Sequence, residues 1–151
     1  MKKSSTAQRG STGFHGAWRL VAFEEETPDG ETVYPYGKDA VGSLIYDSSG
    51  RMSVQIMRRD RMSLSSASWN IAPAELIKTA IEGFTAFFGT YVVDEANGIV
   101  VHRVEGHVLP ESVGKELQRE FVFSGDVLTL KPSANRRVIW ERVRPREKTS
   151  T

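Results

Sequence analysis

Short stretches in which apolar and polar residues alternate are the most frequent pattern along this sequence. In residues 116–123, for example, Leu117 and Phe121 fall on one face of an extended strand. Gln118 and Glu120 fall on the other face. Gly, Pro, Asp, Asn and Ser, which favour turns, separate such stretches at short intervals. The sequence therefore predicts many short strands: 18–24, 32–36, 41–46, 52–57, 87–94, 99–105, 116–123, 127–130 and 135–143.

One segment, residues 73–84, follows a helical pattern instead. Its apolar residues recur on one face of a helix, and they are Leu76, Ile77, Ala80, Ile81 and Phe84. Pro73 suits the first helical turn and Glu75 suits its positive end. Gly83 is unfavourable inside a helix, which favours an end near it. We expect this helix to cover one open end or one side of the sheet.

The connections between the predicted strands favour a meander of neighbouring antiparallel strands. Residues 95–98 and 124–126 are short enough for hairpins. Eight or nine such strands must hide two edges, and closure into a barrel does so best. The sequence therefore predicts an all-β protein with a closed antiparallel up-and-down barrel and one short helix. A two-sheet sandwich is the alternative. We expect a single domain over residues 14–143, with disordered tails at 1–13 and 144–151.

Composition excludes several functional classes. The chain has 151 residues and no cysteine, which rules out disulfides, thiol catalysis and cysteine-ligated metals. A net charge of +1 argues against a dedicated nucleic-acid binder, and the basic run at 57–61 is interpreted as solvated. The first residues lack the apolar stretch of a signal peptide, and no stretch is long enough for a membrane helix. We therefore expect a cytoplasmic location.

Two motifs at the ends of the predicted sheet resemble those of lipocalins. Gly16 and Trp18 form a Gly-x-Trp motif at the first strand, and Arg142 lies in the last strand. Lipocalins and their relatives carry a Gly-x-Trp at the first strand and an arginine that packs over the indole from the last strand. The resemblance implies a cation–π contact between Trp18 and Arg142 that closes one end of the barrel.

Longer stretches resemble the lipocalin-like domain family of bacterial and fungal proteins, in the same order over nearly all of residues 14–143. They are Tyr36-Gly37, Gly42-x-Leu44-x-Tyr46, Gly50 to Gln55, Phe88-Gly89-Thr90-Tyr91, Val100-Val101-His102, Glu105-Gly106 and Pro110. The resemblance implies a calycin-type barrel with a small-molecule cavity, and some family members occur beside natural-product pathways. The chain departs from the family pattern where a second histidine, a small residue and an Asn-Trp pair are common; here stand Arg103, His107 and Glu111-Ser112. We therefore assign no chemistry to a His–His pair.

His102 is the candidate catalytic residue. It shares one strand face with Val100 and Val104, but the other face carries Ile99 and Val101, so alternation alone does not decide which face is interior. An imidazole in an apolar cavity can transfer a proton near neutral pH. The alternative is a structural histidine that bonds a neighbouring group. His102 and His107 are five residues apart, so a straight strand would point them to opposite faces. We predict no metal site and no cofactor.

The candidate ligand contacts combine a few polar groups with adaptable apolar ones. Arg119 shares the aromatic-rich face of its strand, which is the better candidate for the barrel interior. Methionine adapts to irregular apolar ligands, and the segment before the predicted helix is interpreted as a lid. The predicted ligand-binding residues are Tyr46, Tyr91, Arg119, Met52, Trp69, Phe88 and Phe121.

Three functions remain open from the sequence. The first is binding of a small, largely apolar metabolite in the barrel. The second is a cofactor-free cyclase, isomerase or dehydratase that acts on a polyketide-like or terpenoid substrate in the same cavity. Such a reaction needs shape, exclusion of water and at most one acid or base, and leaves no motif. The third is a structural or protein-binding barrel whose interior is filled by side chains.

Overall fold

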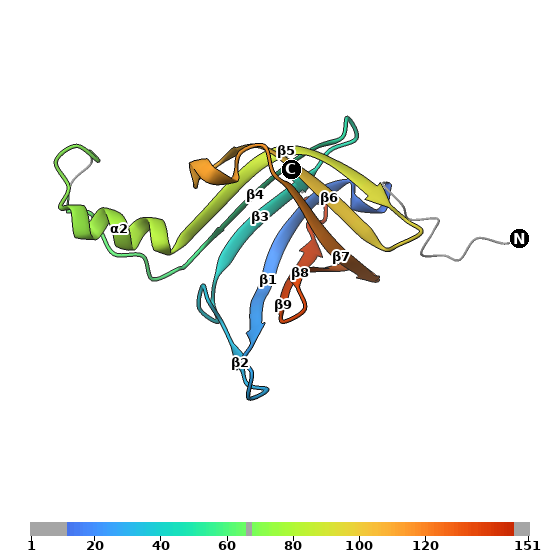
Figure 1. Cartoon of the computed structure of the whole chain (residues 1–151), viewed down its shortest axis with the longest axis horizontal. Helices are drawn as coiled ribbons and strands as arrows, with labels where there is room; N and C mark the ends of the chain where they lie inside the picture. The colour runs from blue at the N-terminus through green and yellow to red at the C-terminus, as the bar shows by residue number, and fades with distance from the viewer. Residues whose placement is uncertain (1–11, 66–67, 147–151) are drawn as a thin grey trace, which may run out of the picture.

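The chain folds as a single antiparallel sheet that closes into a barrel (Figure 1). The computed structural model describes residues 12–65 and 68–146. Its elements are β1 (Gly16–Glu26), β2 (Thr32–Val33), β3 (Val41–Tyr46), β4 (Arg51–Met57), α2 (Ala74–Glu82), β5 (Phe84–Asp94), β6 (Ile99–His107), the 3₁₀ turn η1 (Pro110–Ser112), β7 (Glu116–Ser124), β8 (Val127–Ser133) and β9 (Arg136–Arg142). The strand order is β2-β1-β3-β4-β5-β6-β7-β8-β9, and pairing of β1 with β9 closes the barrel. The predicted barrel is confirmed.

Strand β1 closes the barrel because it pairs on both sides. Its first residues pair with β3, and residues 18–25 pair with β9, with a bulge between Leu20 and Ala22. A bulge bends a strand and increases its twist, which a closed barrel needs. β2 is an extra strand that pairs with the far end of β1. It is shorter than the predicted 32–36, and Pro35, which has no N–H to donate, lies in the loop that follows.

The turn residues close the hairpins as the sequence predicts. Between β3 and β4, the Asp47 carboxylate accepts bonds from the backbone N–H of Ser49 at 2.9 Å and of Arg51 at 3.1 Å. Gly50 completes this turn with a φ of +91°, a value that residues with a Cβ rarely adopt. Local side-chain bonds of this kind fix the hairpin register, and the register decides which residues face inward.

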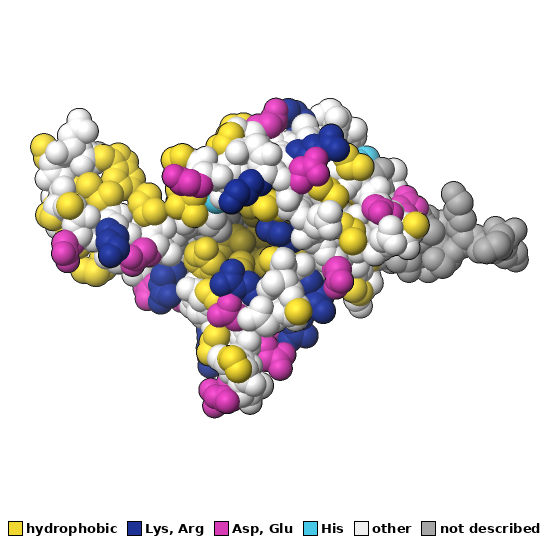
Figure 2. Space-filling view, in the orientation of Figure 1, with side chains coloured by type: hydrophobic (Ala, Val, Ile, Leu, Met, Phe, Trp, Pro, Cys, Tyr) yellow, Lys and Arg dark blue, Asp and Glu magenta, His cyan; other side chains and the backbone are white. Residues whose placement is uncertain are grey.

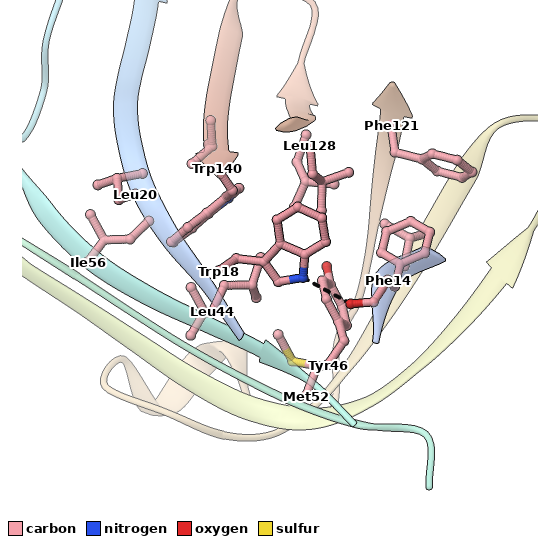
Figure 3. Close-up of a cluster of buried hydrophobic side chains, with 14 of the residues drawn as sticks. Phe14, Trp18, Leu20, Leu44, Tyr46, Met52, Ile56, Phe121, Leu128 and Trp140 are labelled. Carbon is pink, nitrogen blue, oxygen red and sulfur yellow. Dashed lines mark hydrogen bonds between the residues drawn. The ribbon is translucent and has the colours of Figure 1, made fainter. Parts of the chain in front are cut away.

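Phe14 fills the end of the barrel at which β1 begins (Figure 3). It belongs to a helical turn at residues 12–14. Its ring centre lies 4.9 Å from that of Phe121, 5.0 Å from that of Phe123 and 5.1 Å from that of Tyr46, each in an edge-on arrangement. The indole N–H of Trp18 donates to the Phe14 carbonyl at 2.9 Å. Aromatic side chains therefore pack this end of the barrel closed.

Arg142 holds that end together. Its guanidinium lies 4.3 Å from the centre of the Trp18 ring, which confirms the contact that the lipocalin resemblance implies. The same group donates to the carbonyls of His15 at 2.6 Å and Gly13 at 2.7 Å. A side chain of the last strand thus ties the N-terminal turn to the barrel wall. Asp126, 3.8 Å from the Arg142 Nε, balances its charge.

The helix α2 projects away from the barrel instead of covering its mouth (Figure 1). Ala80 is buried, and Gly83, which follows the helix, packs against the side chain of Arg58. Of the two positions expected for the helix, the open end is wrong, because no residue of α2 lines the barrel cavity described below. No helix in the described residues is long and apolar enough to cross a membrane.

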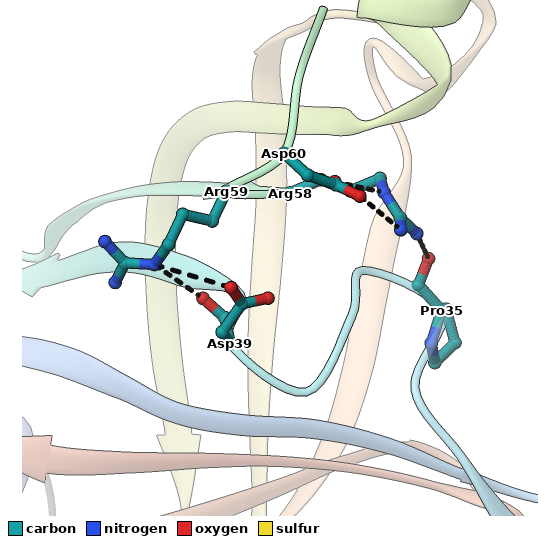
Figure 4. A network of polar contacts seen from close by, with 5 residues as sticks. All are labelled: Pro35, Asp39, Arg58, Arg59 and Asp60. Atoms are coloured by element: carbon teal, nitrogen blue, oxygen red, sulfur yellow. Dashed lines mark hydrogen bonds and ion pairs between the residues drawn. The ribbon is translucent and has the colours of Figure 1, made fainter.

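Two arginines fix the start of the segment that leads to α2 (Figure 4). The Arg58 guanidinium donates to the Asp60 carboxylate at 2.9 and 3.2 Å and to the Pro35 carbonyl at 3.4 Å. Arg59 donates to the carbonyl of Asp39 at 3.2 Å. These bonds tie the end of β4 to the loop between β2 and β3. Arg58 and Arg59 also pair with the carboxylates of Asp60 and Asp39, so two cations of the basic run at 57–61 are balanced locally.

The described residues extend slightly beyond the predicted domain of 14–143 at both ends. Residues 12 and 13, which the sequence assigned to the N-terminal tail, belong to the helical turn that carries Phe14. At the other end, Arg144 pairs with Asp126 at 2.5 Å. The rest of the two predicted tails, 1–11 and 147–151, lies outside the described residues, as do residues 66–67.

Candidate functional site

The barrel contains a cavity of about 190 Å³ at the end opposite Phe14. β1 enters at the packed end near Trp18, and Phe23, further along the same strand, lines the cavity. Figure 2 shows this side of the molecule hollowed, with hydrophobic side chains inside the hollow and Lys or Arg side chains around it. The apolar lining includes Phe23, Leu44, Val54, Ile56, Phe87, Leu130 and Val138. The polar lining is Tyr36, Thr85, His102, His107, Arg119, Arg136 and the indole of Trp140.

Two of the predicted site residues, His102 and Arg119, line this cavity. His102 lies on the buried face of β6 with Val100 and Val104, whereas Arg103 lies on the exposed face. β7 places Arg119 two residues after Leu117, which also lines the cavity. The face of β7 that the sequence favoured is therefore the interior one.

Four other predicted contacts are buried in the packed end instead. Met52 and Phe121 belong to the core cluster, and Phe121 packs against Phe14. Tyr91 packs against Tyr46 with ring centres 4.7 Å apart, and its hydroxyl donates to the Asp47 carbonyl at 2.9 Å. None of these residues lines the cavity. All four are buried, in the end of the barrel where Phe14 packs against Tyr46, Tyr91 and Phe121.

The remaining two predicted contacts lie on the outer surface. Phe88 is 51% exposed, and its ring covers Gly106 on the neighbouring strand β6. Trp69 is 52% exposed in the segment before α2. Neither lines the cavity, and we do not retain either as a contact of a ligand held there. The prediction for Trp69 depends on a lid formed by the segment before the helix. The structure places Trp69 beside α2, which projects away from the mouth.

The Tyr46 hydroxyl and the His102 imidazole form a buried pair. The hydroxyl oxygen lies 2.6 Å from Nε2 of His102, and the two side chains are 0% and 3% exposed. Burial raises the pKa of Tyr46 far above its usual value, so the phenol stays protonated. Burial, followed by the nearby charge of Arg119, lowers the pKa of His102 to about 3. Both groups are therefore neutral at pH 7.

The hydrogen-bond count assigns the His102 tautomer. If the Tyr46 hydroxyl donates to Nε2, the proton of the ring is on Nδ1 and one N–H is left without a partner. If Nε2 donated instead, both the hydroxyl hydrogen and the Nδ1 lone pair would lack partners. The first arrangement leaves fewer buried groups unsatisfied and is the favourable one. His102 thus presents an unpaired Nδ1–H.

Trp140, which lines the same cavity, carries a second buried donor without a partner in the described part of the chain. Its side chain is 1% exposed, and its Nε1–H has no hydrogen-bond partner among the described residues. An indole nitrogen can only donate. Buried donors of native proteins are nearly always satisfied, so two unsatisfied donors on residues that line one cavity need an explanation. The sequence analysis assigned Trp140 only to the last strand and gave no signal for this role.

Arg119 adds a cation to these donors. It is half-buried, and within the described part of the chain it forms no ion pair; its one hydrogen bond goes to the Gln118 carbonyl at 3.2 Å. Desolvation by burial lowers the pKa of Arg119, and the Tyr46 phenol raises it to a lesser extent. Opposite Arg119 on β6 is Val100, next to His102 along the inner face. Arg119 and His102 are thus diagonal neighbours across two paired strands, a separation that a long side chain spans.

The mouth of the cavity carries three further polar side chains. The His107 Nδ1 accepts a bond from the Leu109 N–H at 2.9 Å, so the ring proton is on Nε2. Burial lowers the pKa of His107, and burial raises that of Tyr36. Arg136 pairs with Glu25 at 2.6 Å. Although a straight strand would point His107 to the face opposite His102, its ring stacks on Phe87 at 5.3 Å and lines the mouth.

The cavity lining contains neither aspartate nor glutamate. Among the described residues there is also no group of three or more His, Asp or Glu side chains that could hold a metal ion. His102 and His107 both reach the cavity because β6 shifts register between them, where Val104 and Gly106 pair with consecutive residues of β5. The site is therefore an apolar chamber whose polar groups mainly donate hydrogen bonds or carry positive charge.

Comparison with known proteins gives a family and a similar structure. The family model described as a lipocalin-like domain matches residues 15–149. No curated protein matches the chain. The crystal structure of a lipocalin-like protein from Bacteroides uniformis is similar, with 16% sequence identity and a TM-score of 0.47. That similarity covers 86% of this chain and 98% of the other.

Proposed function

The chain belongs to the lipocalin-like domain family, and we propose that it binds a small, largely apolar molecule inside the barrel. The observation that carries this proposal is the cavity of about 190 Å³, which is lined mainly by apolar side chains and opens at one end. A barrel whose interior only stabilised the fold would be filled by side chains, as the end around Phe14 is. Apolar lining with a few placed polar groups is typical of ligand sites.

The volume limits the size of the enclosed part of the ligand. A dry cavity of about 150 Å³ holds benzene, and pockets for drug-sized ligands have about 300–1,000 Å³. At about 190 Å³, this cavity encloses a single ring with a short substituent, or an aliphatic body of similar size. A polycyclic polyketide or terpenoid would extend out of the mouth.

The lowered pKa of His102 favours a binding function over a catalytic one. General acid–base catalysis works best when the pKa of the group is close to the working pH. Burial lowers the pKa of His102 to about 3, so its imidazole is a weak base in the ligand-free protein. The alternative, a cofactor-free cyclase, isomerase or dehydratase of natural-product biosynthesis, would require the substrate itself to raise this pKa. The other histidine of the lining, His107, lies at the mouth, and its Nδ1 is already bonded to the Leu109 N–H.

Native mass spectrometry of the purified protein tests the proposal. We expect a co-purifying molecule, or a bound member of an added library of single-ring compounds. Leu117→Trp fills the cavity from β7 and should abolish the complex, whereas Val122→Trp, on the exposed face of the same strand, should not. Equal retention of the ligand by both variants would place it outside the barrel, and no complex with any compound would remove the proposed function.

A further inference from the structure

We propose that the ligand is a small organic acid whose carboxylate is bound inside the barrel by Arg119, His102 and Trp140. This inference rests on the proposed function, because it assumes that the cavity holds a small molecule. It goes further in naming the ligand's chemical class: a monocarboxylate on a single-ring or short aliphatic body.

The two unsatisfied groups that point to this ligand are both hydrogen-bond donors. The Nδ1–H of His102 and the Nε1–H of Trp140 are both donors, both are more than nine-tenths buried, and neither has a partner among the described residues. A buried donor without a partner is unfavourable, because it has lost its hydrogen bond to water and gained none in the protein. His102 and Trp140 both line one cavity, so we infer that a single ligand with two acceptor atoms satisfies both donors. A carboxylate has two acceptor oxygens and no donor.

Arg119 brings a positive charge to the cavity that no acidic lining residue balances. Arg119 is a cation that β7 places on the inner face of the barrel, where no aspartate or glutamate lines the cavity to balance it. Arg136 at the mouth, by contrast, pairs with Glu25, so the lack of an anion is specific to the inner arginine. A guanidinium binds a carboxylate through two parallel hydrogen bonds, and one of its five N–H groups is used by the Gln118 carbonyl. The missing counter-charge is therefore supplied by the ligand.

The His102 donor is held in place by Tyr46 and the aromatic side chains packed around it. The Tyr46 hydroxyl holds Nε2 of His102 at 2.6 Å, which orients the ring so that Nδ1 is the free nitrogen. Tyr46 is itself fixed by Phe14 and Tyr91, whose ring centres lie 5.1 and 4.7 Å away. The donor is thus preorganised by the packed end of the barrel. Preorganisation reduces the ordering cost of binding and makes a small ligand sufficient.

Calorimetric titration with a matched pair of ligands tests the inference. Phenylacetate and phenylacetamide share a ring and a carbonyl but differ in charge, and ethylbenzene serves as the apolar probe without acceptors. We expect phenylacetate to bind at least about tenfold more tightly than phenylacetamide, since charge-assisted hydrogen bonds are roughly twice as strong as neutral ones. Arg119→Gln should reduce phenylacetate to the affinity of the amide, and Arg119→Lys should retain part of the preference. Arg103→Gln, which removes an arginine from the outer face of β6, should change neither ligand.

Each other outcome overturns the inference and reports separately on the proposed function. Equal affinities for the acid and the amide, or a preference for the acid that survives Arg119→Gln, would show that Arg119 does not select an anion. Binding of ethylbenzene alone would also overturn the inference while leaving an apolar ligand site in place. If none of the three probes binds and the library of single-ring compounds gives no complex, the inference and the proposed function both fail. Circular dichroism of each variant confirms that loss of binding is not loss of fold.

Discussion

The hydroxyl of Tyr46 lies 2.6 Å from Nε2 of His102, and this pair joins the two halves of the barrel interior. On one side, Tyr46 packs against Phe14 in the closed end. On the other side, His102 lines the cavity. A single buried hydrogen bond therefore connects the packing of the fold to the geometry of the candidate site.

Removing the hydroxyl of this pair should destabilise the protein. Tyr46→Phe leaves both nitrogens of the buried His102 ring without a partner, and we expect a loss of about 1–3 kcal/mol in the free energy of unfolding. Urea denaturation measures this loss. Tyr91→Phe is the control, because its hydroxyl bonds the Asp47 carbonyl in a less buried position and should cost less. Unchanged or increased stability in Tyr46→Phe would contradict the assigned hydrogen bond.

The protein should become less stable as the pH decreases, because of His102. Its pKa is about 3 in the folded protein and close to 6.5 in the unfolded chain, so between these values the unfolded chain binds a proton that the folded one does not. Unfolding therefore becomes easier as the pH falls below about 6.5, by at most about 1.4 kcal/mol per pH unit for this one group. The effect is absent above that range.

Urea denaturation between pH 7 and about pH 5, where few carboxylates titrate, measures this slope. His102→Gln should lose most of it. His107, whose pKa burial also lowers, acts in the same direction and is present in both proteins, so the difference between them isolates His102. Identical slopes would mean that His102 accepts a proton in the folded state as readily as in the unfolded one.

The contact between Trp18 and Arg142 should make the closed end strongly sensitive to substitution. We expect Trp18→Ala to cost about 3–5 kcal/mol, as for other buried aromatic residues. Arg142→Ala should cost less, through lost packing, the cation–π contact and the bond to the Gly13 carbonyl. A double-mutant cycle measures their coupling. Arg137→Ala, at a surface ion pair, should stay within about 1 kcal/mol of the wild type.

If Trp18→Ala and Arg142→Ala are both tolerated within about 0.5 kcal/mol, which is the usual range for surface substitutions, the role assigned to this contact is wrong.

Arg119 should reduce the stability of the ligand-free protein. It is a partly desolvated cation without a counter-ion among the described residues, and such a charge is unfavourable in an apolar setting. We expect Arg119→Met to raise the melting temperature, while the same substitution of the exposed and ion-paired Arg103 should not. Residues retained at a cost in stability are typical of functional sites. A lower melting temperature for Arg119→Met would instead assign Arg119 a structural role.

The strands were predictable because their signal is local. Alternating polarity and turn residues such as Gly50 fix each hairpin without reference to the rest of the chain. Closure into a barrel follows from the need to hide two edges. The position of α2 was not predictable in this way, because its apolar face indicates only that it packs somewhere. Where a helix lies is decided by distant contacts, such as the bonds of Arg58 to the Pro35 carbonyl and to the carbonyl of Gly83 at the end of α2.

The candidate site was predictable only in part, because a cavity is formed by residues that meet across the barrel. The aromatic-rich face of its strand predicted Arg119 to be interior, and the structure places Arg119 on the cavity. For His102 both strand faces carry aliphatic residues, so alternation could not decide which face is interior. The same aromatic-rich face pointed Phe121 inward, but the sequence could not show that Phe14 packs against it. Trp140 went unnoticed as a ligand donor because a lone indole on a strand is an ordinary core residue.

The indole N–H signals give the most direct test that a small molecule enters this cavity. The chain has three tryptophans in three different surroundings. Trp18 donates to a backbone carbonyl, and Trp69 is exposed. Trp140 lines the cavity, and its N–H has no partner among the described residues. We propose to follow their signals in proton–nitrogen NMR spectra while phenylacetate or ethylbenzene is added. The account predicts a saturable shift of the Trp140 signal, largest with phenylacetate, while the other two signals stay in place. A Trp140 signal that does not move at ligand saturation, or movement of Trp69 alone, would contradict binding inside the barrel.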